Sequence, residues 1–154
     1  MKKIIVTGCS SGIGYFIAEN LIKSGYKVVG LSRNEPKEKY NFDFEKCDVR
    51  NFDSVKSFFS KIKKDKDIYG LLNIAGVASM NLLVSTPDKT IQDIINTNLI
   101  GTIYCVKEVI PCFVRSQVGR IINFSSFAVK IGFTSAFSKW VVDLTISISS
   151  SLDG

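Results

Sequence analysis

The sequence contains no histidine, and its four cysteines, Cys9, Cys47, Cys105 and Cys112, form no C-x-x-C pair. Protein metal sites that use nitrogen or sulfur ligands are built from clustered His and Cys residues, and disulfide scaffolds need closely spaced cysteines. The sequence therefore indicates neither a metal site nor a disulfide framework. We expect four reduced and mostly buried thiols.

Long apolar runs are also lacking. No stretch approaches the roughly 20 apolar residues that span a bilayer, and the apolar part of MKKIIVTGCSSG at the N-terminus is too short for a signal peptide. The 154 residues are 45% hydrophobic and include only three prolines, enough for one compact domain but not for two. We expect a single cytoplasmic domain, residues 1–154, with no membrane partner.

Positive charge is in excess, with 20 Lys and Arg against 14 Asp and Glu. The densest cluster is KIKKDKD at residues 61–67, at the end of an amphipathic segment. Aspartates interrupt the lysines, and no aromatic residues lie between them to stack on nucleic-acid bases. This pattern favours a solvated helix end over a nucleic-acid interface.

Apolar, β-branched runs alternate with segments of helical periodicity. The sequence predicts strands at 2–8, 26–32, 44–49, 69–76 and 119–126, and helices at 12–25, at 51–64 and, as two further helices, between 88 and 115. Strands that are apolar on both faces and alternate with helices are typical of a parallel sheet covered on both sides. We therefore predict a doubly wound, Rossmann-type α/β fold of five strands with helices on both faces.

The clearest chemical motif is VTGCSSGIG, residues 6–14, between the first predicted strand and helix. Gly8 permits a tight turn, Gly12 lets backbone amides approach a pyrophosphate, and Gly14 lets the helix pack close to the strand. The helix N-terminus then faces the phosphates. The motif predicts a dinucleotide-binding loop that includes Ser10, Ser11 and Ile13; the alternative is a turn without a ligand.

The end of the second strand distinguishes between the two nicotinamide dinucleotides. An acidic residue there would bind a ribose 2′-hydroxyl, but this chain has GLSRNE, with Ser32 in that place and Arg33 next to it. A guanidinium can pair with a 2′-phosphate. NADP(H) is therefore favoured and NAD(H) remains possible, because Arg33 could also be a solvated loop residue and Glu35 lies nearby.

Five motifs in order resemble those of the classical short-chain dehydrogenases/reductases. TGCSSGIG matches the glycine motif of this family, and CDVR, LLNIAG, NTNLIGTIYCVKEVIPCF and GRIINFSS match its next four motifs over residues 2 to about 128. The resemblance implies that Asp48 binds the adenine amino group and Val49 contacts the ring. It further implies that Asn73, Ala75 and Gly76 belong to the cofactor site and that Asn98 and Ser126 are catalytic.

The activity that the resemblance implies is hydride transfer between a nicotinamide and a carbonyl or alcohol substrate. In the family, a tyrosine four residues before a lysine supplies the proton. Here Lys139 is the matching lysine, but Ser135 lies four residues before it, and an alternative alignment places Phe137 in the tyrosine's position. Neither replaces a phenol as an acid near neutral pH, and no tyrosine follows Tyr104.

The chain also ends at Gly154, short of the usual length of the family, and residues 129–154 are shortened and atypical. We therefore expect impaired hydride transfer. Three interpretations remain. The first is a working reductase of small carbonyl or alcohol substrates whose missing parts come from a partner subunit, as in a homo-oligomer, or from an unusual catalytic acid. The second is an impaired reductase that still binds a dinucleotide, and the third is a non-catalytic interaction module. The last would use the fifth strand, because in a sheet that stops there the apolar run RIINF lies at an edge.

Overall fold

The computed structural model describes residues 1–79 and 83–125. Its elements are β1 (Lys3–Thr7), α1 (Gly12–Lys23), β2 (Lys27–Ser32), β3 (Asp43–Lys46), α2 (Phe52–Ile62), β4 (Ile68–Asn73), the 3-10 turn η1 (Leu83–Ser85), α3 (Asp88–Ile95), the π-helical turn η2 (Asn96–Ile100), α4 (Gly101–Ser116) and β5 (Arg120–Asn123). Five strands at the expected places confirm the predicted fold class.

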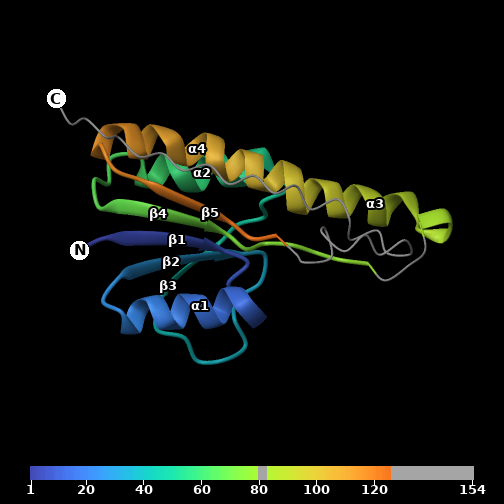
Figure 1. Ribbon diagram of the computed structural model, residues 1–154, viewed down its shortest axis with the longest axis horizontal. Coiled ribbons are helices and arrows are strands. Elements are labelled where there is room, and N and C mark those ends of the chain that lie inside the picture. Colours follow the sequence, from blue (N-terminus) through green and yellow to red (C-terminus); the bar gives the residue numbers. More distant parts are fainter. Residues whose placement is uncertain (80–82, 126–154) are drawn as a thin grey trace.

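All five strands are parallel and lie in the order β3-β2-β1-β4-β5. At the centre of the sheet, Ile5 of β1 pairs with Val29 of β2 on one side and with Leu71 of β4 on the other. Helix α1 covers one face, and α2 and α4 cover the other (Figure 1). Each face therefore has its own core, and the central strands are apolar on both sides, as parallel sheets require.

The helices form where the sequence pattern places apolar residues on one side. In α2, Val55, Phe58 and Phe59 are buried, and the Asn51 side chain caps the helix by accepting a hydrogen bond of 2.9 Å from the Ser54 amide. An N-cap of this kind satisfies an amide that the helix leaves unpaired. The helix predicted at 51–64 is confirmed, with Asn51 as its N-cap; it begins at Phe52 and ends at Ile62, two residues earlier than expected.

The third predicted strand is shorter than expected. It ends at Lys46, so that Asp48 and Val49 lie in the loop that follows. The backbone changes direction here because the Asp48 amide donates to the hydroxyl of Ser54 on α2, at 3.2 Å, instead of to a neighbouring strand. This loop therefore projects beyond the carboxyl edge of the sheet.

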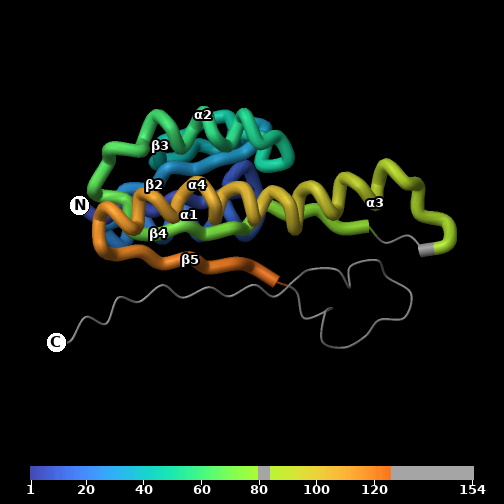
Figure 2. The backbone as a smooth tube through the Cα atoms, turned by 90° about the horizontal axis from the view of Figure 1, so that it is seen from above, coloured from blue at the N-terminus to red at the C-terminus, as the bar shows by residue number. Residues whose placement is uncertain are grey.

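The two helices predicted between 88 and 115 are α3 and α4, joined without a break by η2. By length and composition alone, Asp88–Ser116 could cross a membrane. Its C-terminal half is instead a core helix of this fold, because five apolar residues on one face of α4 are buried: Cys105, Val106, Val109, Cys112 and Phe113. The N-terminal part, α3, extends beyond the sheet (Figure 2).

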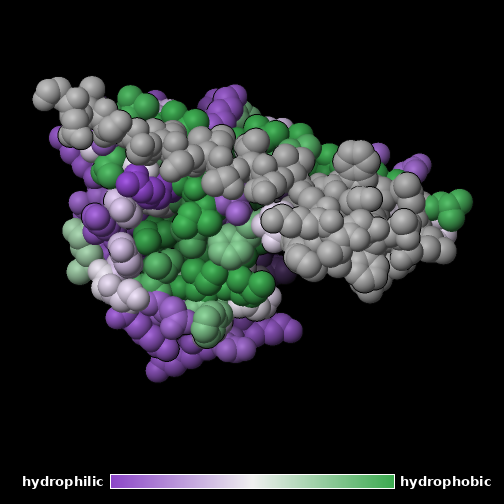
Figure 3. Space-filling view, viewed as in Figure 1, coloured by the Kyte–Doolittle hydropathy of each residue, from purple (hydrophilic) through white to green (hydrophobic). Residues whose placement is uncertain are grey.

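Among the described strands, β5 lies at one edge of the sheet. Ile121 is buried, but Ile122 is half exposed and Phe124 is 38% exposed. Apolar surface gathers in the middle of the face shown in Figure 3. The expectation that the apolar run of the fifth strand lies at a sheet edge is therefore confirmed for the part of the chain that the structure describes.

Candidate functional site

A cleft of about 380 Å³ opens at the carboxyl ends of the strands. It lies where the chain order reverses, between β1 and β4, which is where open α/β sheets bind their ligands. Its walls come from the loops after β1, β2, β3 and β4 and from η2: Gly8, Ser10, Ser11, Ile13, Gly14, Leu31, Ser32, Arg33, Asn34, Cys47, Asp48, Val49, Ile74, Ala75, Gly76, Val77 and Thr97. Eleven of the thirteen predicted cofactor residues are in this set.

The other two predicted cofactor residues lie next to the cleft. Gly12 is the first residue of α1 and has a positive φ of 58°. Asn73 is the last residue of β4 and is buried. Its side-chain amide donates a 2.8 Å hydrogen bond to the side-chain oxygen of Asn123 on β5. Asn73 therefore joins two strands rather than lining the cleft.

Two of the three motif glycines, Gly8 and Gly14, are packed too tightly for larger residues. Gly8 has φ +73°, and a Cβ atom there would lie 2.8 Å from the backbone of Ala75. A Cβ atom on Gly14 would lie 2.2 Å from the carbonyl oxygen of Gly8. These two contacts bring the start of α1 and the loop after β4 against the end of β1.

The N-terminus of α1 is open toward the cleft. Its N-cap, Ser11, makes no side-chain cap hydrogen bond, and the first turn contains no acidic residue. Ser11, Ile13 and Gly14 all line the cleft. Uncapped amides and the positive end of the helix dipole favour an anion at this position.

Thr7 connects the two strand ends on either side of the cleft, a role that the sequence reasoning missed. Its buried hydroxyl accepts hydrogen bonds of 3.0 Å from the amides of Ile74 and Ala75, and donates one of 3.4 Å to the carbonyl of Leu72. All the hydrogen-bonding capacity of a threonine hydroxyl is thereby used. The only signal in the sequence was a threonine directly before the first motif glycine.

At the end of β2, Ser32 and Arg33 differ in exposure. Ser32 is buried, and its hydroxyl donates to the carbonyl of Asn34. Arg33 is exposed at the cleft, and no ion pair to it occurs among the residues that the structure describes. Glu35 accepts a hydrogen bond from the hydroxyl of Tyr40 and does not line the cleft.

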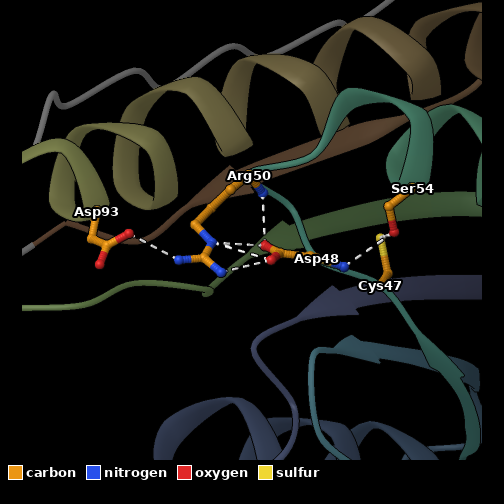
Figure 4. Close-up of polar contacts among 5 residues, drawn as sticks. All are labelled: Cys47, Asp48, Arg50, Ser54 and Asp93. Atoms are coloured by element: carbon orange, nitrogen blue, oxygen red, sulfur yellow. Dashed lines mark hydrogen bonds and ion pairs between the residues drawn. The ribbon is translucent and has the colours of Figure 1, made fainter. Parts of the chain in front are cut away.

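Asp48 is held by a residue that the sequence reasoning did not single out. The Arg50 guanidinium forms a fork with its carboxylate, with Nη2 at 2.8 Å and Nε at 3.0 and 3.2 Å, and also pairs with Asp93 of α3 at 2.9 Å (Figure 4). These bonds to Arg50 hold the pKa of Asp48 below its ordinary value. Asp48 therefore remains an ionised hydrogen-bond acceptor near neutral pH.

Asn98, predicted to be catalytic, lies in the π-helical turn η2. Its side chain makes two hydrogen bonds of 2.8 Å with the backbone of Val77, accepting from the amide and donating to the carbonyl. The loop after β4 is thereby fixed to η2. Such π-helical turns are frequent at functional sites.

The remaining predicted catalytic positions, Ser126, Ser135, Phe137 and Lys139, lie outside the described residues. The five tyrosines are all described, and none of them lines the cleft. The hydroxyl of Tyr15 donates to the carbonyl of Lys39, and the ring of Tyr104 packs against Phe52.

The four cysteines are free and buried, as expected. Cys9 lies in the glycine loop, where a helix N-terminus can favour a reactive thiolate. Its side chain is fully buried, and burial raises its pKa to about 11. Cys9 is therefore a packing residue of the loop rather than a reactive thiol.

Comparison with known proteins identifies relatives of this chain. The short chain dehydrogenase family matches residues 2–138. The 3-oxoacyl-acyl-carrier-protein reductase FabG of Buchnera aphidicola is 36% identical over 129 residues, which are 79% of this chain and 53% of that protein. The chain spans about half the length of the curated relatives it matches.

Two solved structures are similar in both fold and sequence. Ligand-free aldohexose dehydrogenase of Thermoplasma acidophilum has a TM-score of 0.82 and 38% identity, over 89% of this chain and 54% of that one. The closed form of serine dehydrogenase in complex with NADP+ has a TM-score of 0.75 and 27% identity, over 83% and 55%.

The hydroxyl of Thr7 provides a direct test of the link between β1 and β4. Thr7→Val keeps the shape of the side chain but leaves two partly buried amides without an acceptor, so we expect the free energy of unfolding to fall by about 1–3 kcal/mol. Thr7→Ser keeps the hydroxyl and should lose about 1 kcal/mol or less. Urea denaturation measures both; a valine variant as stable as the serine variant would contradict the link.

The Asp48–Arg50 pair predicts a pH dependence of stability. Since folding lowers the pKa of Asp48, its contribution to stability is present above the ordinary value of 3.8 and is lost as the pH falls through the lowered one. Asp48→Asn should therefore destabilise the chain at about pH 7 and do so much less at about pH 3. Chemical denaturation at both pH values measures the difference in the free energy of unfolding between the unaltered chain and the variant. A difference that is the same at both pH values would show that the ion pair is not its cause.

Proposed function

The chain belongs to the short-chain dehydrogenase family, and we propose that its cleft binds NADP(H) in preference to NAD(H). The observation that carries this proposal is the combination of an uncapped helix N-terminus at the cleft with Arg33 exposed beside it. The first suits a pyrophosphate and the second a 2′-phosphate.

The residues of the cleft fit a dinucleotide. The space that Cβ atoms on Gly8 and Gly14 would fill is taken by backbone, so neither position can carry a side chain at the edge of the cleft. Thr97 lines the cleft, and its hydroxyl is buried next to it with no hydrogen-bond partner in the described part of the chain. A buried hydroxyl without a partner is costly in a protein alone, which supports a polar ligand in this space.

The preference for a 2′-phosphate depends on the charges at the end of β2. Within the described residues the exposed guanidinium of Arg33 forms no ion pair, whereas the nearby carboxylate of Glu35 accepts a hydrogen bond from the hydroxyl of Tyr40. Ser32 carries no charge, so no acidic residue occupies the position that would bind a ribose 2′-hydroxyl. These features together support NADP(H) over NAD(H).

The reaction class follows from the family and is part of the proposal. A nicotinamide supplies the hydride when it is bound. Asn98 fixes the loop after β4, which forms one wall of the cleft, through its two bonds to Val77. Ser126 and Lys139 would polarise and orient a carbonyl or alcohol, but Ser135 or Phe137 stands where the family has its tyrosine. We therefore propose that this chain transfers hydride poorly, because proton transfer by a positioned acid typically contributes 10²–10⁴ in rate.

A second candidate function is a non-catalytic protein-interaction module. The observation that favours it is the partly exposed apolar edge at Ile122 and Phe124 of the β5 region. An exposed strand edge can pair with another chain. This function does not require the cleft, so cofactor binding separates the two candidates.

Calorimetric titration with NADPH and with NADH tests the proposed function. We expect micromolar binding of NADPH and binding of NADH weaker by about tenfold. Arg33→Gln should remove most of this difference by weakening NADPH alone, while Arg115→Gln, which removes a guanidinium from the far end of α4, should change neither affinity. Equal affinities in the unaltered chain would contradict the preference, and no binding of either would favour the interaction module.

A further inference from the structure

The hydrogen bonds around Asp48 leave its carboxylate with little free capacity. A carboxylate has about four acceptor positions. Oδ1 accepts from the backbone amide and from Nε of Arg50, both at 3.0 Å, and Oδ2 accepts from Nη2 at 2.8 Å. The single hydrogen on Nε is shared with Oδ2 at 3.2 Å. One acceptor position therefore remains, on Oδ2.

Arg50 acts on this carboxylate from outside the cleft. Asp48 lines the cleft, whereas Arg50 does not and instead lines a separate cavity of about 260 Å³ together with Asp93. Asp93, on α3, holds the other end of the guanidinium at 2.9 Å. The close-up in Figure 4 shows Arg50 lying between the two carboxylates. Arg50 is thus held at both ends, by Asp48 of its own loop and by Asp93, which lies 43 residues further along the chain.

We propose that Arg50 is a positioning residue that turns the Asp48 carboxylate so that its one remaining acceptor position faces the 6-amino group of a bound adenine. This inference rests on the proposed dinucleotide binding and on the adenine contact that the family resemblance implies for Asp48; what it adds is the role of Arg50 in orienting that carboxylate. Adenine is selected over hypoxanthine because the 6-amino group of adenine donates a hydrogen bond, whereas the 6-oxo group of hypoxanthine can only accept one.

The neighbouring residues suit this arrangement. Val49, next in the chain, is buried and lines the same cleft, so it provides an apolar surface for a purine ring. The guanidinium also keeps Asp48 ionised, and an ionised carboxylate has no proton to offer to a 6-oxo group. A carboxylate held in one orientation should discriminate between the two bases more strongly than a freely rotating one. Its side chain loses no further conformational entropy when the hydrogen bond to the base forms.

The test compares NADPH with its deaminated analogue, nicotinamide hypoxanthine dinucleotide phosphate, by calorimetric titration. The unaltered chain should bind NADPH about tenfold more tightly than the analogue, as expected for one hydrogen bond to a charged group. Arg50→Met and Arg50→Lys should each reduce this ratio to about twofold, since neither side chain can form the fork. Arg115→Met should leave the ratio at about tenfold.

The outcomes separate a positioning role from other roles. If Arg50→Lys keeps the tenfold ratio, a positive charge beside Asp48 is sufficient and the proposal is wrong. A weaker affinity for both ligands with an unchanged ratio would likewise overturn it, since general destabilisation or lost charge lowers both. If the unaltered chain binds both ligands equally, this inference fails and the proposed function stands. If it binds neither, both fail. The lysine variant keeps the charge and is the one to rely on if Arg50→Met does not fold.

Discussion

The structure depends on the close contact between the carboxyl ends of β1 and β4. The hydroxyl of Thr7 accepts from two amides of the loop after β4, and Gly8 lies so near Ala75 that a side chain on it would meet the backbone. Chain order reverses between these two strands. Two loops that would otherwise diverge are thereby held at a fixed separation, and the cleft lies between them. The fold alone would place a crevice here, and this contact joins the loops after β1 and β4 that line it.

The walls of the cleft are fixed by further long-range contacts of the same kind. Asn98 holds the loop after β4 to η2, and Arg50 holds the loop after β3 to α3. The helix that contains α3, η2 and α4 therefore contacts both loops, while its C-terminal half packs in the core on the sheet. A cleft built in this way is largely preformed. Little of the binding free energy would then be spent on ordering the loops of the cleft. A small number of polar groups can therefore bind a ligand tightly.

The sequence predicted the elements and the glycine loop well because these depend on local rules. Apolar periodicity identified the strands and helices, and the order of motifs identified the family. Contacts between distant residues could not be predicted in this way. Nothing near Arg50 in the sequence indicates that Asp93 lies beside it, and the role of Thr7 becomes clear only when β4 is placed next to β1. The end of β3 was placed too late because CDV reads as a strand, although the Ser54 hydroxyl turns its backbone away. The roles of Ser126, Ser135, Phe137 and Lys139 remain predictions from the family resemblance.

The central claim is that a dinucleotide lies in the cleft against the glycine loop and the loops after β2, β3 and β4. The most direct measurement is a two-dimensional amide NMR spectrum of the ¹⁵N-labelled chain with and without saturating NADPH. The account predicts that the shifted amides cluster at residues 8–14, 32–34, 48–49 and 74–77, with little change in α2 or at the lysine-rich residues 61–67. Shifts centred on residues 61–67, or a spectrum that NADPH does not change, would contradict it.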